Sequence, residues 1–122
     1  SFASSENVLK NLNNVYWILG GIPKEGDKFK LSKVKCKNLK AFIFGSHYKK
    51  FIKILQNRLE IKSYKNLQET LKVIFSEINI QKSKKIIIFF SPAGASFDIF
   101  KNFEDRGYYF NQLIKKYTNA KR

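Results

Sequence analysis

The sequence predicts a three-layer α/β domain, in which a mostly parallel sheet is covered by helices on both faces. Short apolar runs alternate along the chain with segments of helical periodicity, which is typical of a parallel sheet. Several of these runs are apolar at every position, as expected for strands that are buried on both faces. A length of 122 residues with 43% hydrophobic residues suits one globular domain.

Four apolar runs are expected to form the strands. Two of them stop at glycine, a residue that commonly interrupts a strand. The third run alternates apolar and polar residues and is the weakest strand signal, whereas the fourth is the most hydrophobic. The runs are VYWILGG at 15–21, KAFIFG at 40–45, LEIKSY at 59–64 and KIIIFF at 85–90.

The first two expected helices begin at serine. Ser4-Ser5-Glu6 predicts a helix start, because serine caps helices and an early acid favours the helix dipole. Asn13-Asn14 ends this helix. A short helix is also expected within LSKVKCKNL at 31–39. In SHYKKFIKILQNR, Ser46 is a possible cap, and the apolar face consists of Tyr48, Phe51, Ile52 and Leu55.

The later helices complete the pattern. Asn66 is expected to cap the segment NLQETLKVIFSEI. Two further helices are expected from about 96 to 106 and from about 108 to 117, separated at Gly107. The apolar stripe of the Asn66 helix consists of Leu67, Leu71, Val73, Ile74 and Ile78.

The carboxyl ends of the expected strands indicate where a ligand would bind. Ligands of open parallel sheets collect at this edge. Three of these ends carry small residues, namely Gly20-Gly21, Gly45 and Ser91-Pro92. We therefore expect a binding site at this edge.

A formal net charge of +15 raises nucleic-acid binding as an alternative function, because basic residues neutralise phosphates. Only three of the 24 basic residues are arginines, which are best suited to bidentate phosphate contacts. The lysines are spread from Lys10 to Lys121, and the abundance of Ile and Asn is expected from an A·T-biased genome. We therefore favour a solvated lysine surface and expect no nucleic-acid partner.

The chain lacks the sequence motifs of an independent enzyme. It contains no GxxxxGK[ST], GxGxxG or GxSxG pattern. His47 and Cys36 are the only histidine and cysteine, so a four-ligand zinc site is excluded, and His47 is interpreted as a helix-start residue. A lone cysteine, no apolar stretch of ~20 residues and no visible export signal together predict a cytoplasmic protein without a membrane partner.

Two loops carry candidate anion-binding groups. In SPAGASF the small residues from Pro92 to Ala95 leave backbone amides accessible, and Ser96 places a hydroxyl at a helix N-terminus, which favours anions. From the residues alone, the alternative that Ser96 only caps its helix stays open. Phe97, Phe100 and Phe103 have the spacing of core residues. In GGIPKEG, Lys24 could neutralise the same anion, although loop lysines are usually only solvated.

Two segments resemble a known family. WILGGIPKEG at 17–26 and SPAGASFDIFKNFEDRG at 91–107 are similar to the C-terminal domain of the Mur ligases, most closely those that add D-glutamate to UDP-N-acetylmuramoyl-L-alanine. The second segment meets the family pattern SPA-x-AS-x-D-x-F-K-x-F/Y-E-x-RG. The resemblance extends from about Ser4 to Tyr117 and implies a Rossmann-like fold for residues 1–122 as a single domain.

The resemblance implies a role in peptidoglycan synthesis. Such ligases use ATP and Mg²⁺, bound mainly by a central domain, to convert a carboxyl group to an acyl phosphate that the D-glutamate amine attacks. Lys24 and Ser96 match residues that bind the D-glutamate side-chain carboxylate, assisted by the amide of Phe97, and Phe103 matches an aromatic residue lining the same pocket. No catalytic or metal-binding residue is expected in this chain, which alone should be inactive, monomeric and free of cofactors.

The chain departs from the family pattern at two places. The family segment DSKATN would end at about Ser1, so we expect the UDP-sugar and ATP-binding domains to lie outside this chain. Gly94 replaces a cysteine of many relatives, a change between two small residues. A Mur-type ligase for another amino acid remains an alternative.

Overall fold

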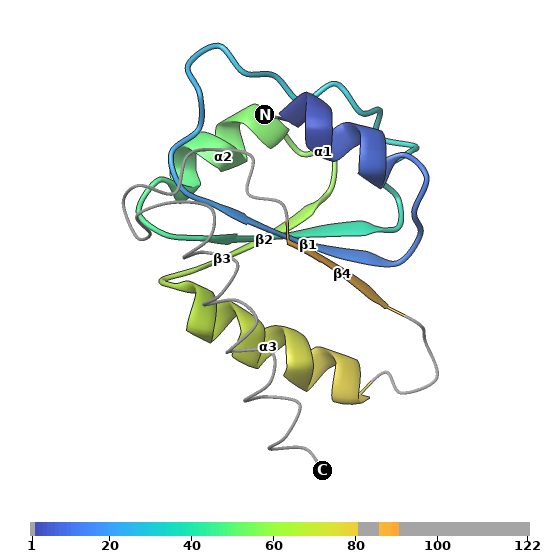
Figure 1. Cartoon of the computed structure of the whole chain (residues 1–122), viewed down its shortest axis with the longest axis vertical. Coiled ribbons are helices and arrows are strands. Elements are labelled where there is room, and N and C mark those ends of the chain that lie inside the picture. Colours follow the sequence, from blue (N-terminus) through green and yellow to red (C-terminus); the bar gives the residue numbers. More distant parts are fainter. Residues whose placement is uncertain (1, 81–85, 91–122) are drawn as a thin grey trace.

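The described part of the computed structural model covers residues 2–80 and 86–90, and its centre is a four-stranded parallel sheet. The strands lie in the order β3-β2-β1-β4, and each neighbouring pair is parallel. Three helices surround the sheet (Figure 1). The elements in chain order are α1 (Phe2–Leu9), β1 (Val15–Gly20), β2 (Leu39–Phe44), α2 (Tyr48–Leu55), β3 (Glu60–Tyr64), α3 (Leu67–Ile80) and β4 (Ile87–Phe90).

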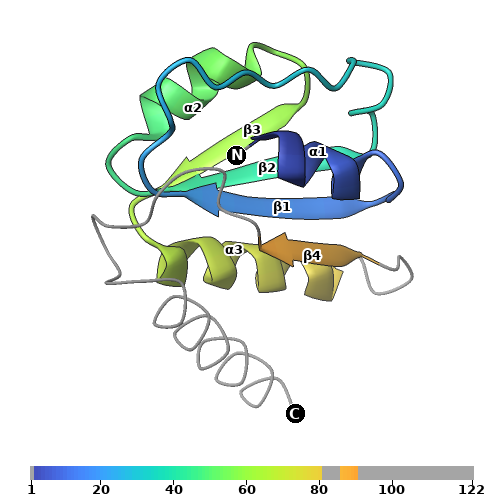
Figure 2. The same cartoon turned by 45° about the horizontal axis from the view of Figure 1, so that its top comes forward.

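The helices cover both faces of the sheet and create three layers. In Figures 1 and 2, α1 and α2 lie on one face and α3 lies on the other. Two separate clusters of buried side chains fill the two interfaces. The three-layer Rossmann-like α/β fold predicted from the sequence is therefore confirmed.

The interface between the sheet and α1 and α2 is rich in aromatic side chains. Trp17 of β1 is fully buried and stacks on Phe29, with ring centroids 5.7 Å apart. Phe2 of α1 contacts Trp17, Phe29 and Phe51 edge-to-face at 6.0–6.1 Å. Leu9 and Leu55 complete this cluster, which we call the aromatic face.

The opposite interface combines apolar and charged contacts. Leu67, Leu71 and Ile74 of α3 pack on Ile18, Phe42 and Phe44 of the sheet. The side chains of β1 are divided between the two clusters, because successive side chains of a strand point to opposite faces of the sheet. Val15, Trp17 and Leu19 therefore join the aromatic face, while Tyr16 and Ile18 join the face under α3, which we call the α3 face.

Gly20 permits close contact between β1 and β2. It pairs with Phe44 in the register of the two strands. A Cβ atom at position 20 would lie 2.7 Å from both the ring and the carbonyl oxygen of Phe44. Such an approach is too close for a real Cβ, so only glycine fits here without displacing β2.

Two predicted helix starts are wrong. The first helix begins at Phe2, so Ser4 and Ser5 lie within it and Ser5 is buried. Glu6 instead accepts a hydrogen bond from the amide of Lys30 (2.8 Å). The second helix begins after His47, which occupies the N-cap position without a side-chain bond, so Ser46 is not the cap.

The helix expected at 31–39 is also absent, since residues 33–38 form turns that lead into β2. Ile52, assigned to the buried face of α2, is 39% exposed, whereas Phe51 and Leu55 are fully buried. The short α2 has room for only one narrow buried stripe, and Ile54 packs against the core instead.

The third helix agrees best with its prediction. The Asn66 side chain accepts a hydrogen bond from the amide of Glu69 (2.8 Å), which confirms the predicted cap. Leu67, Leu71, Ile74 and Ile78 form the stripe, joined by Phe75 rather than Val73. All four predicted strands occur; three lie within their expected ranges, and β2 begins one residue earlier than predicted, at Leu39. The helices expected at 96–106 and 108–117 lie outside the described residues, and no helix within 2–80 is long and apolar enough to cross a membrane.

Candidate functional site

The carboxyl ends of the strands meet at one edge of the sheet. Gly20 pairs with Phe44, and Phe44 pairs with Tyr64, so β1, β2 and β3 end side by side. β4 ends next to β1, where Phe90 pairs with Ile18. The amide of Gly45 donates to the carbonyl of Tyr64 (3.3 Å) and closes this edge between β2 and β3. Figure 2 shows the arrowheads of the strands pointing the same way.

Lys24 lies on the loop that leaves β1 at this edge. The chain turns at Gly21, whose φ of 90° lies in the left-handed region. A tight turn then runs from Lys24 to Asp27 and is closed by a hydrogen bond from the Asp27 amide to the Lys24 carbonyl (3.1 Å). Gly26, with a φ of 79°, supplies the conformation that such a turn requires. The Lys24 side chain is exposed, and no acidic partner is recorded for it among the residues described.

The part of the loop that follows Lys24 is firmly attached to the domain. Phe29 is 2% exposed and packs against both Phe2 and Trp17. The Arg58 guanidinium donates to the backbone carbonyls of Phe29 and Leu31. An ammonium group is thus held near the carboxyl end of β1, on a loop with a fixed base.

A pocket of about 430 Å³ opens at the same edge, between β2, β3 and the start of α2. Four of its lining residues, Ser46, Tyr48, Ser63 and Tyr64, carry hydroxyl groups. Its lining residues are Gly45, Ser46, Tyr48, Ser63, Tyr64 and Lys65.

A larger cavity lies at the opposite edge of the sheet, where the strands begin. Its volume is about 860 Å³, and it is lined by residues that include Val15, Leu39, Glu60 and Ile86. Size alone would favour this cavity, but ligands of parallel α/β sheets bind at the carboxyl edge. We therefore assign the candidate site to the edge that carries Lys24.

Of the predicted site residues, the structure describes only Lys24. Ser96, Phe97 and Phe103 lie outside the described residues, so their meeting with Lys24 remains a prediction. Among residues 2–80 and 86–90, no three side chains of His, Cys, Asp or Glu are grouped to hold a metal ion. The side chain that sequence reasoning missed near Lys24 is Asp27. In the sequence, the only indication of a role for Asp27 is its position three residues after Lys24, the spacing of the first and last residues of a β-turn.

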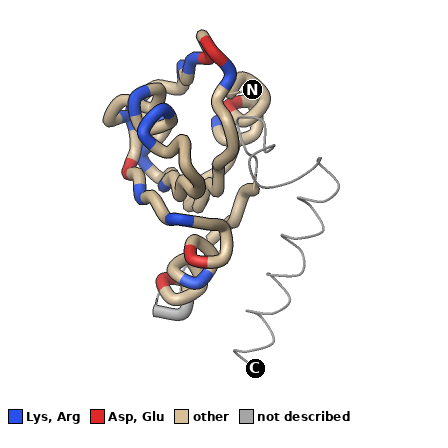
Figure 3. The backbone as a smooth tube through the Cα atoms, turned by 90° about the vertical axis from the view of Figure 1, so that its left-hand side faces the viewer, with Lys and Arg blue, Asp and Glu red and all other residues tan. Residues whose placement is uncertain are grey.

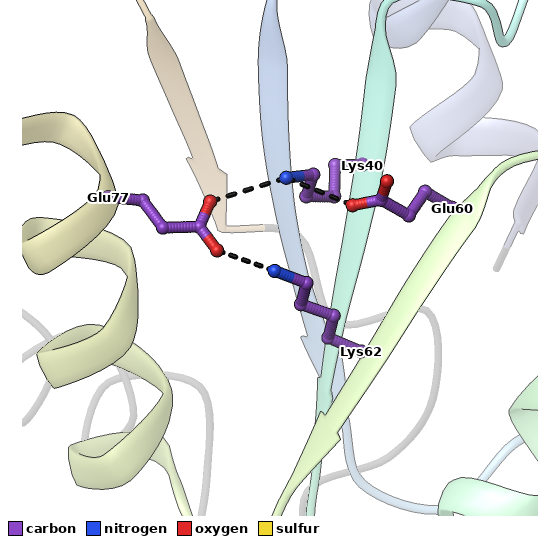
Figure 4. A network of polar contacts seen from close by, with 4 residues as sticks. All are labelled: Lys40, Glu60, Lys62 and Glu77. Atoms are coloured by element: carbon purple, nitrogen blue, oxygen red, sulfur yellow. Dashed lines mark hydrogen bonds and ion pairs between the residues drawn. The ribbon is translucent and has the colours of Figure 1, made fainter. Parts of the chain in front are cut away.

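The α3 face contains an ion-pair network that the sequence did not reveal (Figure 4). The Glu77 carboxylate accepts from Lys62 (2.6 Å) and Lys40 (3.3 Å), and Lys40 also pairs with Glu60 (2.9 Å). Burial alone would raise the pKa of Glu77, but hydrogen bonds from Lys62, Tyr16 and Lys40 outweigh burial and lower it. The network joins α3 to β2 and β3, so we interpret it as structural.

The same contacts shift the partners of Glu77. Burial alone would lower the pKa of Lys40, yet its bonds to Glu60 and Glu77 raise it. Burial raises the pKa of Tyr16, and its hydrogen bond to Glu77 acts in the same direction. Both shifts favour the protonated forms, a charged Lys40 and a neutral Tyr16, which are the forms that donate to Glu77.

Basic residues outside this network are spread over the molecule. Figure 3 shows Lys and Arg on loops, strands and α3, with Asp and Glu between them. In this view, the basic positions of the described residues are distributed along the chain and do not form one continuous block.

The fold and the placement of Lys24 define the chain as a Rossmann-like α/β domain with its candidate site at the carboxyl edge of the sheet. No family model matches the chain. It is similar to a UDP-N-acetylmuramoylalanine–D-glutamate ligase of Wolbachia sp. subsp. Brugia malayi, with 35% identity over 117 residues, which cover 96% of this chain and 23% of that protein.

Ligases of the same name from other bacteria give similar values. Identity is 32% for the Rickettsia felis protein, over 93% of this chain and 25% of that ligase. It is 31% for the Bartonella henselae protein, over 91% of this chain and 24% of that ligase. The chain is therefore similar to part of the ligases that bear this name, as the two sequence segments predicted, and spans about a quarter of their length.

Proposed function

We propose that residues 1–122 form the C-terminal, amino-acid-binding domain of a ligase that adds D-glutamate to UDP-N-acetylmuramoyl-L-alanine in peptidoglycan synthesis. The observation that carries this proposal is the similarity to such ligases over 96% of the chain. The position of Lys24 at the carboxyl edge of the sheet supports it. We place the reaction in the cytoplasm and expect a monomer.

In this proposal the chain binds and orients the incoming amino acid. ATP, bound with Mg²⁺ mainly by another domain, supplies the phosphoryl group that activates the carboxyl of UDP-N-acetylmuramoyl-L-alanine. The D-glutamate nitrogen then forms a bond to the activated carbonyl carbon, phosphate leaves, and the amine loses a proton. The domain contributes by holding the amine in line with that carbon, since positioned reactants avoid much of the entropic cost of meeting.

Lys24 and Ser96 bind the other end of the substrate. The Lys24 ammonium pairs with the D-glutamate side-chain carboxylate, and the Ser96 hydroxyl and the Phe97 amide donate to the same group. Phe103 lines the pocket. Because the Lys24 side chain is exposed, a salt bridge made by this domain alone is weak. We expect the isolated chain to bind D-glutamate with millimolar affinity, about −4 kcal/mol, measured by calorimetry; micromolar binding would contradict this expectation.

Replacement of Lys24 in the complete ligase tests the proposal. We expect Lys24→Ala and Ser96→Ala each to lower kcat/KM for D-glutamate by a factor equivalent to about 1–3 kcal/mol, because a charged partner is left unsatisfied. Phosphate release with each substrate varied in turn is the measurement. Lys28→Ala is the matched control, since Lys28 is an exposed lysine of the same loop. Unchanged activity of both Lys24→Ala and Ser96→Ala would refute the assignment.

The identity of the amino acid needs a separate test. The similar proteins, at 31–35% identity, are named as D-glutamate ligases, and this supports D-glutamate as the substrate. A Mur-type ligase for another amino acid is the alternative. Competition of D-glutamate against L-glutamate and meso-diaminopimelate in the same assay distinguishes the two. Preference for either competitor would replace D-glutamate as the assigned substrate.

A further inference from the structure

We propose that Asp27 is a positioning residue that fixes the Lys24 turn against the start of α1. This inference rests on the proposed role of Lys24 in binding the substrate carboxylate. It adds a residue that acts through Lys24 without touching the substrate itself.

The Asp27 carboxylate joins two parts of the chain. Its Oδ2 accepts a hydrogen bond from the amide of Phe2 (3.1 Å), the first residue of α1. Its Oδ1 accepts from the amide of Lys28 (3.1 Å). Its own amide donates to the Lys24 carbonyl (3.1 Å). One residue thus closes the turn that begins at Lys24 and attaches this turn to a helix that is packed into the aromatic face.

Within residues 2–80 and 86–90, few other contacts hold this turn. Lys24, Glu25 and Gly26 are all exposed, and a Cβ at Gly26 would meet nothing within 4 Å. The next buried side chain is that of Phe29. Between Ile22, which forms an isolated strand bridge, and the anchor at Phe29, the Asp27 carboxylate and amide make the hydrogen bonds found at the Lys24 turn among the described residues. Displacement of a binding group by even about 1 Å is enough to weaken a reaction strongly.

A second carboxylate makes the same kind of contact and provides a control. The Glu6 side chain of α1 accepts from the amide of Lys30 (2.8 Å), so it also joins α1 to this loop. Lys30 follows the Phe29 anchor, however, and is separated by it from the Lys24 turn. Loss of the Glu6 bond should loosen the contact between α1 and the loop without moving Lys24.

The test uses the complete ligase with Asp27→Ala, Asp27→Asn and Glu6→Ala. We expect Asp27→Ala to raise KM for D-glutamate about tenfold, with the KM values for ATP and the UDP-sugar substrate unchanged. Asp27→Asn keeps one acceptor oxygen but turns its NH₂ group toward the second amide, so it should show a smaller increase. Glu6→Ala should lower Tm and leave all three KM values unchanged. An equal rise in all KM values, or the same rise in Glu6→Ala, would overturn the inference.

A double-mutant cycle distinguishes positioning from general stabilisation. If Asp27 acts through Lys24, Asp27→Ala should add less than about twofold to KM in the Lys24→Ala background. A multiplicative effect would overturn the inference. Unchanged KM in Lys24→Ala would refute the proposed role of Lys24, on which this inference rests, whereas a raised KM in Lys24→Ala with a normal KM in Asp27→Ala would refute only the role of Asp27.

Amide hydrogen exchange on this chain provides a readout that does not depend on activity. The amides of Phe2 and Lys28 should lose protection in Asp27→Ala and retain it in Glu6→Ala. Equal protection in the wild-type chain and Asp27→Ala would show that the two bonds do not fix the turn, and would overturn the inference.

Discussion

The two faces of the sheet are held by different interactions. On the aromatic face, Phe2, Trp17, Phe29 and Phe51 pack with ring contacts of 5.7–6.1 Å, and the buried cluster contains no charged side chain. On the α3 face, apolar packing is supplemented by bonds from Glu77 to two strand lysines. Packing of apolar groups is insensitive to pH, whereas the ion pairs depend on it. The comparison therefore predicts that the packing of α3 depends in part on ion pairs that are lost at low pH, whereas the contacts between the aromatic rings on the other face do not depend on pH.

Truncation of the aromatic face should have the largest effect. Trp17 is fully buried between Phe2 and Phe29, so Trp17→Ala should destabilise the chain by about 3–5 kcal/mol through lost contacts and a cavity. Urea unfolding followed by circular dichroism is the measurement, because this change removes the single tryptophan. Val34→Ala, at a position 83% exposed, should change stability by less than about 0.5 kcal/mol. Similar losses in both variants would contradict the assigned core.

Loss of the charge on Glu77 should have an intermediate effect. Glu77→Gln leaves Lys40 and Lys62 without their shared carboxylate, and we expect a loss of about 1–2 kcal/mol at neutral pH. We expect this loss of stability to be modest because Lys62 is 39% exposed and solvent screens its charge. Glu25→Gln, an exposed change on the Lys24 loop, is the control and should be close to neutral.

The pH dependence of this effect sharpens the comparison. The pKa of Glu77 is lowered in the folded chain, so its stabilisation is complete above the unfolded pKa of about 4.3 and is lost as pH falls through the folded value. The stability difference between the wild-type chain and Glu77→Gln should therefore shrink below about pH 4. Trp17→Ala should show no such trend. A difference for Glu77→Gln that is constant across this range would refute the assigned ion pairs.

The helix starts on the two faces should give the smallest effect. Asn66 caps α3 through a side-chain bond to the Glu69 amide, whereas His47 at the start of α2 makes no such bond. Asn66→Ala should cost about 1 kcal/mol, and His47→Ala should be nearly neutral. Conversely, His47→Asp should stabilise the chain by a similar amount, because it adds a cap and an acid near the helix N-terminus. Thermal unfolding of the three variants tests this, and a neutral Asn66→Ala would contradict the cap.

Local sequence signals were sufficient for the four strands and for α3. The apolar run at 15–20 forms β1 and is buried at every position, as predicted. The Asn66 cap is also confirmed, because its bond joins residues only three positions apart in the chain. Ser4 failed as a helix start because Phe2 is drawn into the aromatic face and extends α1 beyond the serines. Burial of an aromatic ring outweighs the smaller contribution of a serine cap.

The candidate site was predictable only in part. Because parallel strands end at one edge, the sequence placed Lys24 there correctly. The role of Asp27 depends on contact with Phe2, a residue far away in the chain, which no local pattern can reveal. The bond between Glu77 and Lys40 is likewise set by packing of α3 on the sheet. Contacts between distant segments are therefore what sequence patterns missed in this domain.

The central position of β1 has a consequence for synthesis of the chain on the ribosome. β1 pairs on one side with β2 and on the other with β4, where Val15 faces Ile87. The strands β1, β2 and β3 can pair while translation continues, but the second edge of β1 must wait until β4 has emerged. During that interval the backbone groups of β1 on the β4 side stay unpaired, and this free strand edge can pair with other nascent chains. Slow codons placed just before β4 should therefore increase aggregation of the newborn protein.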